Sequence, residues 1–243
     1  MNDLNFQLKK FITFANFIKF MNKIDIQAMI APYTVSEIRN LSDATYVVRF
    51  SRRGMVFRPG QHLVVGALGM SDAREYSIYS GKDEEYLEII VREVENGIVS
   101  RKLRRLNPGN NLEVSGPYGF FLTNAQPPEN KKLLFIASGT GIAPFHSFVK
   151  TYPGADYTII HGIRTIDEAY EKDTYAKGKY ITCTSRDEGG DFHGRLTAYL
   201  KSIDIDKDTM VYLCGNSDMV FESIDILQEK GLSNSHIFTE VYF

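Results

Sequence analysis

Two hydrophobic patterns divide this chain. From Tyr33 to Phe121, short runs rich in β-branched and aromatic residues are separated by turn-forming pairs such as Pro59-Gly60 and Asn96-Gly97. Such runs predict strands over residues 33–39, 44–50, 62–65, 74–79, 86–94 and 112–114. Apolar residues at helical spacing predict one helix over residues 98–106. Many short strands at even spacing are typical of an antiparallel β-barrel.

After residue 130 the pattern changes to continuous apolar strands that alternate with helical segments. The predicted strands are 132–137, 157–161, 180–184, 210–214 and 237–241, and the predicted helices are 143–152, 167–176, 196–202 and 218–231. This alternation predicts an α/β domain with a parallel five-stranded sheet, which binds ligands at the carboxyl ends of its strands. We therefore expect a terminal extension over residues 1–30, a barrel domain over 31–125 and an α/β domain over 126–243.

Composition narrows the function classes. The net charge of -2 argues against a nucleic-acid partner, whose binding surface would be basic. The only two cysteines, Cys183 and Cys214, exclude a disulfide scaffold and a four-cysteine iron–sulfur cluster within this chain. Because so few cysteines suit a reducing compartment, we expect a cytoplasmic protein. The five histidines show no metal-ligand spacing, so we expect no metal site.

The apolar stretch over residues 4–21 is interrupted by Lys9, Lys10 and Lys19, and it is too short to span a bilayer. Three interpretations are open: a weak signal peptide, an amphipathic helix that contacts a membrane surface or a partner, and an extension loosely tied to the fold. We favour the third over the second, and both over the first.

The segment Arg74-Glu75-Tyr76-Ser77 carries residue types that a flavin requires. A cation suits the pyrophosphate, a flat aromatic side chain covers the ring system, and a small polar group addresses the reactive nitrogen N5. Strict alternation along a strand would place Ser77 and Tyr76 on opposite faces, so this segment needs a local bend or an edge position. An ordinary barrel strand with a surface arginine is the alternative.

Three further segments stand where phosphates or a nicotinamide bind. Gly97-Ile98-Val99-Ser100 opens the predicted barrel helix, whose first N–H groups suit a phosphate. Gly139-Thr140-Gly141 follows the first α/β strand and opens a helix, with Pro144 where a dinucleotide fingerprint has a third glycine. Cys214-Gly215-Asn216 ends the fourth α/β strand. The alternatives are plain turns, a helix-capping serine and a small buried thiol.

In this order, the four segments resemble the ferredoxin–NADP reductase family over about Tyr33 to Phe243. The resemblance implies a barrel that binds FAD and an α/β domain that binds a nicotinamide dinucleotide. It implies that Arg74 contacts the FAD pyrophosphate, Tyr76 the ring and Ser77 N5. The further cofactor contacts that it implies are Gly97, Ile98, Val99 and Ser100 for the FAD pyrophosphate, Gly139, Thr140 and Gly141 for the dinucleotide pyrophosphate, and Gly215 and Asn216 beside Cys214.

The family also implies a catalytic set of Ser77, Cys214, Glu240 and Tyr242. In it, the cysteine lies beside the nicotinamide during hydride transfer, and the closing Glu-x-Tyr places an aromatic ring over the second face of the flavin. Either Tyr242 or the additional Phe243 takes that position. Ser217 replaces a proline of the family motif and is a candidate helix cap.

The choice of dinucleotide depends on a site for the adenosine 2′-phosphate. Ser185 and Arg186 resemble the family's Ser-Arg pair, Arg195 is a second candidate, and Arg164 is a third. Asp187 and Glu188 follow directly and are alternative salt-bridge partners of Arg186. We expect NADPH rather than NADH.

The expected function is oxidation of NADPH by FAD, followed by delivery of single electrons to ferredoxin or flavodoxin. Such acidic carriers would dock on basic residues. One alternative is a reductase for free flavin or a reductase component of an oxygenase, and another is a nucleotide-responsive binding module that is not an enzyme. The candidate basic residues, which are equally explained as a solvated face, are Arg52, Arg53, Arg101, Lys102, Arg104 and Arg105.

Overall fold

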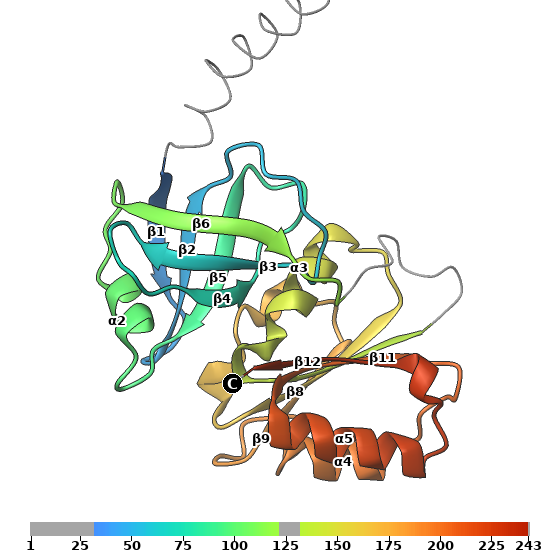
Figure 1. The fold of residues 1–243 in the computed structure, drawn as a ribbon. Helices are drawn as coiled ribbons and strands as arrows, with labels where there is room; N and C mark the ends of the chain where they lie inside the picture. Colours follow the sequence, from blue (N-terminus) through green and yellow to red (C-terminus); the bar gives the residue numbers. More distant parts are fainter. Residues whose placement is uncertain (1–31, 122–131, 243) are drawn as a thin grey trace, which may run out of the picture. The chain divides into compact units, whose positions relative to one another are not determined.

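A computed structural model describes residues 32–121 and 132–242 (Figure 1). The predicted extension over residues 1–30, with its candidate membrane contact at residues 4–21, and the terminal Phe243 lie outside the described residues. From Tyr33 onward the chain forms one compact unit, which contains both predicted architectures.

The first part is a six-stranded antiparallel sheet with the order β4-β3-β6-β1-β2-β5. A bridge between Ile78, just beyond β4, and Ile89 in β5 joins the two edges and closes the sheet into the predicted barrel. The helix α2 (Ile98–Arg104) buries Val99 and Leu103 against this barrel. The strands are β1 (Tyr33–Asn40), β2 (Thr45–Ser51), β3 (His62–Ala67), β4 (Arg74–Ser77), β5 (Tyr86–Arg92) and β6 (Asn111–Tyr118).

The second part is a parallel sheet with the order β10-β9-β8-β7-β11-β12. The first strand β7 lies between β8 and β11, so the strand order reverses at its carboxyl end, where α/β sheets bind ligands. Its elements are β7 (Leu133–Ser138), η1 (Gly139–Ile142), α3 (Ala143–Thr151), β8 (Tyr157–Ile163), β9 (Tyr180–Thr184), β10 (Phe192–His193), α4 (Leu196–Ser202), β11 (Met210–Asn216), α5 (Ser217–Glu229), η4 (Asn234–His236) and β12 (Ile237–Tyr242).

Three sequence expectations about elements were wrong. The parallel sheet has six strands, because the two-residue β10 adds to the edge of β9. The predicted helix over residues 167–176 is replaced by two 3₁₀ turns, η2 (Ile166–Glu168) and η3 (Lys172–Thr174). Glu171 has a left-handed backbone (φ 48°) that interrupts a helix there. The cap of α5 is Asn216, whose side chain accepts from the N–H groups of Asp218 and Met219, and not Ser217.

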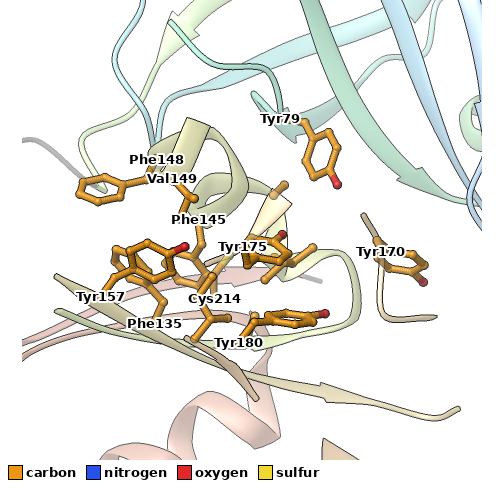
Figure 2. Packing of buried hydrophobic residues seen from close by; sticks show 14 of the residues in the cluster. Tyr79, Phe135, Phe145, Phe148, Val149, Tyr157, Tyr170, Tyr175, Tyr180 and Cys214 are labelled. Atoms are coloured by element: carbon orange, nitrogen blue, oxygen red, sulfur yellow. The ribbon is translucent and has the colours of Figure 1, made fainter. Parts of the chain in front are cut away.

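The apolar residues form three clusters, and one of them spans the two architectures. One cluster fills the barrel, and another lies between the parallel sheet and helices α4 and α5. The third joins Val47, Tyr79 and Ile90 of the barrel to aromatic residues of β7, α3 and β8 (Figure 2). Strand β2 is buried along most of its length because alternate side chains face the barrel interior and this shared core.

Charged residues join the barrel and the α/β part beside this shared core. Arg39 of β1 contacts Glu88 of β5 at 3.0 Å and Glu171, which precedes η3, at 2.7 Å. Glu88 is almost fully buried and also pairs with Arg49 at 2.9 Å. A buried carboxylate requires such partners, and Arg39 connects it to Glu171 of the α/β part.

Candidate functional site

The Arg74–Ser77 segment occupies strand β4, which lies at the edge of the barrel sheet and ends at Ser77. The segment therefore has an edge position, which it needs if Tyr76 and Ser77, whose side chains alternate along the strand, are both to contact a flavin. Arg74 is exposed, and its guanidinium donates to the carbonyl of Ala73 at 2.7 Å. Tyr76 is half-buried against the barrel core, whereas Ser77 is buried. A cation, an aromatic ring and a hydroxyl therefore follow one another along one short strand.

All four predicted catalytic residues lie together, although they come from three strands of two sheets. The Tyr242 hydroxyl donates to Ser77 Oγ at 2.6 Å, and Ser77 Oγ donates to Glu240 Oε2 at 3.3 Å. Cys214 on β11 is the direct neighbour of Glu240 on β12. Its fully buried thiol interacts with the Tyr242 hydroxyl. The barrel strand β4 is thus joined to the carboxyl ends of β11 and β12.

Burial dominates the electrostatics of this cluster. Burial is the largest cause, the hydrogen bond from Ser77 opposes it and the charge of Glu75 adds to it, and together they raise the pKa of Glu240 from 4.5 to about 7. Burial also raises the pKa values of Cys214 and Tyr242 well above their ordinary values. Glu240 therefore exchanges its proton near neutral pH, whereas Cys214 and Tyr242 keep theirs.

Beside this cluster a pocket of about 530 Å³ opens at the carboxyl ends of the parallel strands. Its volume lies within the range typical of cofactor sites, which is roughly 300–1,000 Å³. Eight of the predicted site residues line it, and they are Gly139, Thr140, Arg164, Ser185, Arg195, Gly215, Asn216 and Tyr242.

The glycines of the turn after β7 and of the end of β11 lack either the room or the backbone freedom for a side chain. A Cβ on Gly141 would overlap the backbone of Cys214, and one on Gly215 (φ 139°) would overlap Ser138. Gly139 has a left-handed backbone (φ 53°), and a Cβ there would meet no atom within 4 Å. The turn therefore packs tightly against β11 on one side and leaves open space on the other, which fits the pyrophosphate of a dinucleotide.

His161 supports this turn, and the sequence motifs did not indicate it. Its Nε2 donates to the carbonyl of Gly139 at 2.8 Å, so Nδ1 accepts from the Tyr180 hydroxyl at 2.7 Å. Burial lowers the pKa of His161 to about 4, which keeps the imidazole neutral. The sequence signal that could have indicated it is a histidine within the otherwise apolar strand over residues 157–161.

Three of the four predicted 2′-phosphate residues line the pocket. Ser185 and Arg195 line it, together with Arg164. Arg186 is exposed, is not among the lining residues, and donates its backbone N–H to the carbonyl of Arg164 at 2.8 Å. Asp187 uses its carboxylate to accept from the N–H groups of Ile166 and Gly189, and no ion pair with Arg186 occurs among the described residues.

Arg92 and Glu168 are among the lining residues that the sequence did not indicate. Arg92 at the end of β5 reaches the pocket from the barrel, and its guanidinium donates to Glu168 at 3.0 Å. Glu168 also accepts from the N–H of Arg164 at 2.9 Å. Neither residue belongs to a sequence motif. Their ion pair joins the barrel to the α/β part, so it forms only in the folded protein.

The Gly97–Ser100 segment lies apart from this pocket, at the start of α2. Ser100 is buried, and its hydroxyl accepts from the N–H of Val94 at 3.2 Å. A Cβ on Gly97 would come within 2.5 Å of that hydroxyl, so this position needs glycine. Val99 packs into the barrel core, whereas Ile98 is exposed.

Five of the six candidate basic residues fall into two groups: three make hydrogen bonds or ion pairs within the barrel, and two are exposed on α2. Arg52 donates to the carbonyls of Met55, Lys82 and Glu84, so it serves the local fold. Arg101 and Arg104 pair with Glu93. Lys102 and Arg105 are exposed on α2. Within the described part of the chain, no group of residues could hold a metal ion, and no helix is long and apolar enough to cross a membrane.

These features define a class of protein, a two-domain oxidoreductase with a flavin barrel and a nicotinamide-binding sheet. Residues 32–122 match the oxidoreductase FAD-binding domain family, and residues 135–223 match the oxidoreductase NAD-binding domain family. The chain belongs to the ferredoxin–NADP reductase family of flavin oxidoreductases. The expectations of this family, of the two-domain fold, and of FAD and a nicotinamide dinucleotide as cofactors are therefore confirmed.

The named relatives include a ferredoxin–NADP reductase and an electron transfer component of a dioxygenase. Ferredoxin–NADP reductase of Azotobacter vinelandii is 29% identical over 236 residues, which cover 83% of this chain and 90% of that protein. The toluate 1,2-dioxygenase electron transfer component of Pseudomonas putida is 25% identical over 226 residues, which cover 86% of this chain and 66% of that protein. A crystal structure of a ferredoxin NADP⁺ reductase from Neisseria gonorrhoeae with bound FAD and NADP has a TM-score of 0.75 at 20% identity, covering 88% of this chain and 98% of that one.

Proposed function

We propose that this protein oxidises NADPH through bound FAD and delivers single electrons to ferredoxin or flavodoxin. The observation that carries the proposal is the contact of Ser77 on the barrel with Glu240 and Tyr242 at the mouth of the dinucleotide pocket. This contact supports the proposal because it joins β4, the strand proposed to hold the flavin, to the pocket proposed to hold the nicotinamide. Bound FAD supplies the chemistry, since a flavin accepts a hydride and releases electrons one at a time.

We propose that Arg74 and the Gly97–Ser100 helix start hold the FAD pyrophosphate, with Tyr76 on the ring and Ser77 at N5. The exposed guanidinium of Arg74 and the half-buried ring of Tyr76 support these roles. The residues present fit the cofactor, because a cation, an aromatic face and a hydroxyl occur in that order on an edge strand. Phe243 remains a candidate cover for the flavin.

We propose that Gly139, Thr140 and Gly141 hold the pyrophosphate of the dinucleotide, with Gly215 and Asn216 opposite. The open space beside Gly139 supports this role. Cys214 would then lie under the nicotinamide and act through its shape, because its raised pKa keeps it a neutral thiol.

We propose that Ser185, Arg186 and Arg195 select NADPH by binding its 2′-phosphate. Arg195 lines the pocket, and Asp187 is bonded to backbone N–H groups rather than to Arg186. A double substitution, Arg186→Ala with Arg195→Ala, should lower kcat/KM for NADPH by about a hundredfold and leave that for NADH nearly unchanged. Lys177→Ala, an exposed site outside the pocket, is the matched control. Equal NADPH selectivity in the double variant would contradict the assignment.

The choice of a small redox protein as acceptor is supported by the similarity to ferredoxin–NADP reductase of A. vinelandii, which extends over 90% of that protein. The exposed Lys102 and Arg105 on α2 provide positive charge for an acidic carrier. The test is stopped-flow reduction by NADPH followed by mixing with oxidised ferredoxin or flavodoxin at two salt concentrations. Fast transfer that slows with salt is the expected result.

A reductase component of an oxygenase is the second candidate, because the toluate 1,2-dioxygenase component is also similar. Rapid reduction of an oxygenase component, with no reduction of ferredoxin or flavodoxin, would favour it. A purified protein without yellow colour would favour a free-flavin reductase, and failure to reduce any acceptor would favour a nucleotide-responsive binding module. We also propose a cytoplasmic location, supported by two free, buried thiols and testable by cell fractionation.

A further inference from the structure

A fifth polar residue, His62 on β3, lies beside the Ser77–Glu240 pair and belongs to none of the motifs. In the antiparallel pairing of β3 and β4, His62 is directly opposite Ser77. Directly paired residues share one face of a sheet, as do residues two apart on one strand. His62, Ser77 and Glu75 therefore point to the same side, where Glu240 reaches them from β12.

Four polar side chains form a series from solvent to the interior, and they are Glu75, His62, Glu240 and Ser77. Glu75 Oε2 lies 4.0 Å from His62 Nε2, and His62 Nδ1 lies 3.9 Å from Glu240 Oε1. Glu240 Oε2 then accepts from Ser77 Oγ at 3.3 Å. Side-chain exposure falls from 75% at Glu75 to 19% at His62 and 22% at Glu240, and Ser77 is buried. The series therefore begins in water and ends at the flavin strand.

The backbone makes room for the imidazole in this series. Gly119 has a left-handed backbone (φ 89°), and a Cβ there would come within 2.9 Å of His62 Nδ1. The ring of Tyr118, which pairs with His62 across β6 and β3, lies 6.0 Å from the His62 ring. Glycine at position 119 thus leaves His62 free to face Glu240.

The proposed function requires a path for one proton. A hydride brings one proton and two electrons to the site. When two one-electron acceptors each take one electron, the proton must leave to water, so one NADPH and two oxidised acceptors give NADP⁺, two reduced acceptors and one H⁺. We propose that His62 relays this proton between Glu240 and solvent at Glu75. This inference rests on the proposed function.

Ser77 passes its hydroxyl proton to Glu240 and takes up in its place the proton that the hydride brought. Glu240 gives a proton to Nδ1 of His62, while Nε2 releases a proton to Glu75, which passes it to water. His62 returns to its starting tautomer when its ring rotates and exchanges protons with water. The gaps of 3.9 and 4.0 Å are closed by one bridging water or a small side-chain rotation. His62 acts through Glu240, so it is a positioning and relay residue rather than one that touches the cofactor.

Every titratable group around Glu240 bears on this relay. His62 of β3, Glu75 of β4, Cys214 of β11 and Tyr242 of β12 surround it, and Tyr118 of β6 lies beyond the imidazole. The pKa of Glu240, about 7, lets this carboxyl take up and release a proton near neutral pH.

The first test follows the Glu240 carboxyl by carbon-13 NMR in the oxidised, FAD-loaded protein. His62→Gln removes a potential cation, so the titration midpoint of Glu240 should rise by about half a pH unit. Glu75→Gln removes a negative charge, so the midpoint should fall by about the same amount. His236→Gln, on the distant turn η4, should leave it unchanged. Unchanged midpoints in both His62→Gln and Glu75→Gln would overturn the proposal.

The second test measures reoxidation of the reduced protein by ferricyanide, a one-electron acceptor that needs no protein docking. His62→Gln should slow this step by about tenfold and leave hydride transfer from NADPH unchanged, and added imidazole should restore the rate. His62→Asn serves if the first variant folds poorly. A slowed step that imidazole does not restore indicates a merely structural role and overturns the relay. Neither measurement uses ferredoxin or flavodoxin, so failure of those acceptors would count against the proposed function alone.

Discussion

Gly141 and Gly215 illustrate how single residues shape the dinucleotide pocket. Neither position tolerates a Cβ, because β11 and the turn after β7 approach each other with backbone against backbone. The sequence motif showed glycine at both positions, and the structure supplies the physical reason for each. A glycine-to-alanine substitution at either position, which adds one carbon, should therefore lower the free energy of unfolding strongly.

Gly141→Ala should lower the free energy of unfolding by at least about 2 kcal/mol, because the new methyl group overlaps the backbone of Cys214. Gly154→Ala is the matched control, since a Cβ there meets nothing within 4 Å. Urea denaturation measures both variants. If Gly141→Ala were as stable as the control, the close approach would not exist in solution.

Glu240 is the single residue whose charge state should couple folding to pH most clearly. Because its pKa rises from 4.5 to about 7 on folding, the native state holds a proton that the unfolded state has released. Stability from this group is complete below about pH 4.5 and is lost as pH rises through 7. The stability of Glu240→Gln relative to the parent should therefore increase by up to about 3 kcal/mol between pH 5 and pH 8. Denaturant titrations at both pH values test this, with the exposed Glu95→Gln as control.

At the scale of elements, the loop between β9 and β10 depends on Asp187. Its carboxylate accepts from Ile166 N–H at 2.8 Å and Gly189 N–H at 3.0 Å, which ties the loop to the turn after β8. These hydrogen bonds hold the pKa of Asp187 below its usual value. The loop that carries Ser185 and Arg186 is thereby fixed beside the pocket.

Asp187→Asn should raise the KM for NADPH about fivefold with little change in kcat, because the weakened anchor loosens the loop without touching the reacting atoms. The KM for NADH should change less. The neighbouring exposed residue offers the control Glu188→Gln. An equal effect of both substitutions would show that net charge, rather than the anchor, determines NADPH affinity.

At the scale of the whole molecule, two buried histidines lie near the junction of barrel and sheet. His146 stacks on Tyr79 at 3.7 Å and donates from Nδ1 to the Tyr79 carbonyl at 2.7 Å, while His161 supports the Gly139 turn. Burial lowers the pKa of each from 6.5 to about 4. Both imidazoles therefore stay neutral in the folded protein while the unfolded chain takes up protons.

The free energy of unfolding should accordingly fall as pH decreases from 6.5 to 4, by about 3 kcal/mol for each histidine. The contribution is fully present above pH 6.5 and is lost through that window. His146→Gln and His161→Gln should each flatten the pH dependence, and His236→Gln should not. Denaturation at pH 7, 5 and 4 measures the slopes; a slope that neither substitution changes would contradict this account.

Local pattern indicated most of the elements, and it failed where long-range contacts decide. Residues 167–176 have a helical apolar spacing, yet Glu168 binds Arg92 of the barrel and Glu171 binds Arg39, so the segment turns twice instead. The two-residue strand β10 is too short to leave a periodic signal. Both errors arise because the local preference of a segment for helix or strand is weaker than the tertiary contacts that it makes.

The sequence by itself determined the family, the two architectures and the residue types of the site, because motifs such as Gly139-Thr140-Gly141 encode local backbone requirements. Only the tertiary structure decided that Ser77, Cys214, Glu240 and Tyr242 meet, that Arg92 reaches the pocket, and that His62 faces Glu240. Tyr242 and Ser77, for example, are 165 positions apart in the sequence. They depend on strand order and on the packing of one sheet against another, which no short window of sequence contains.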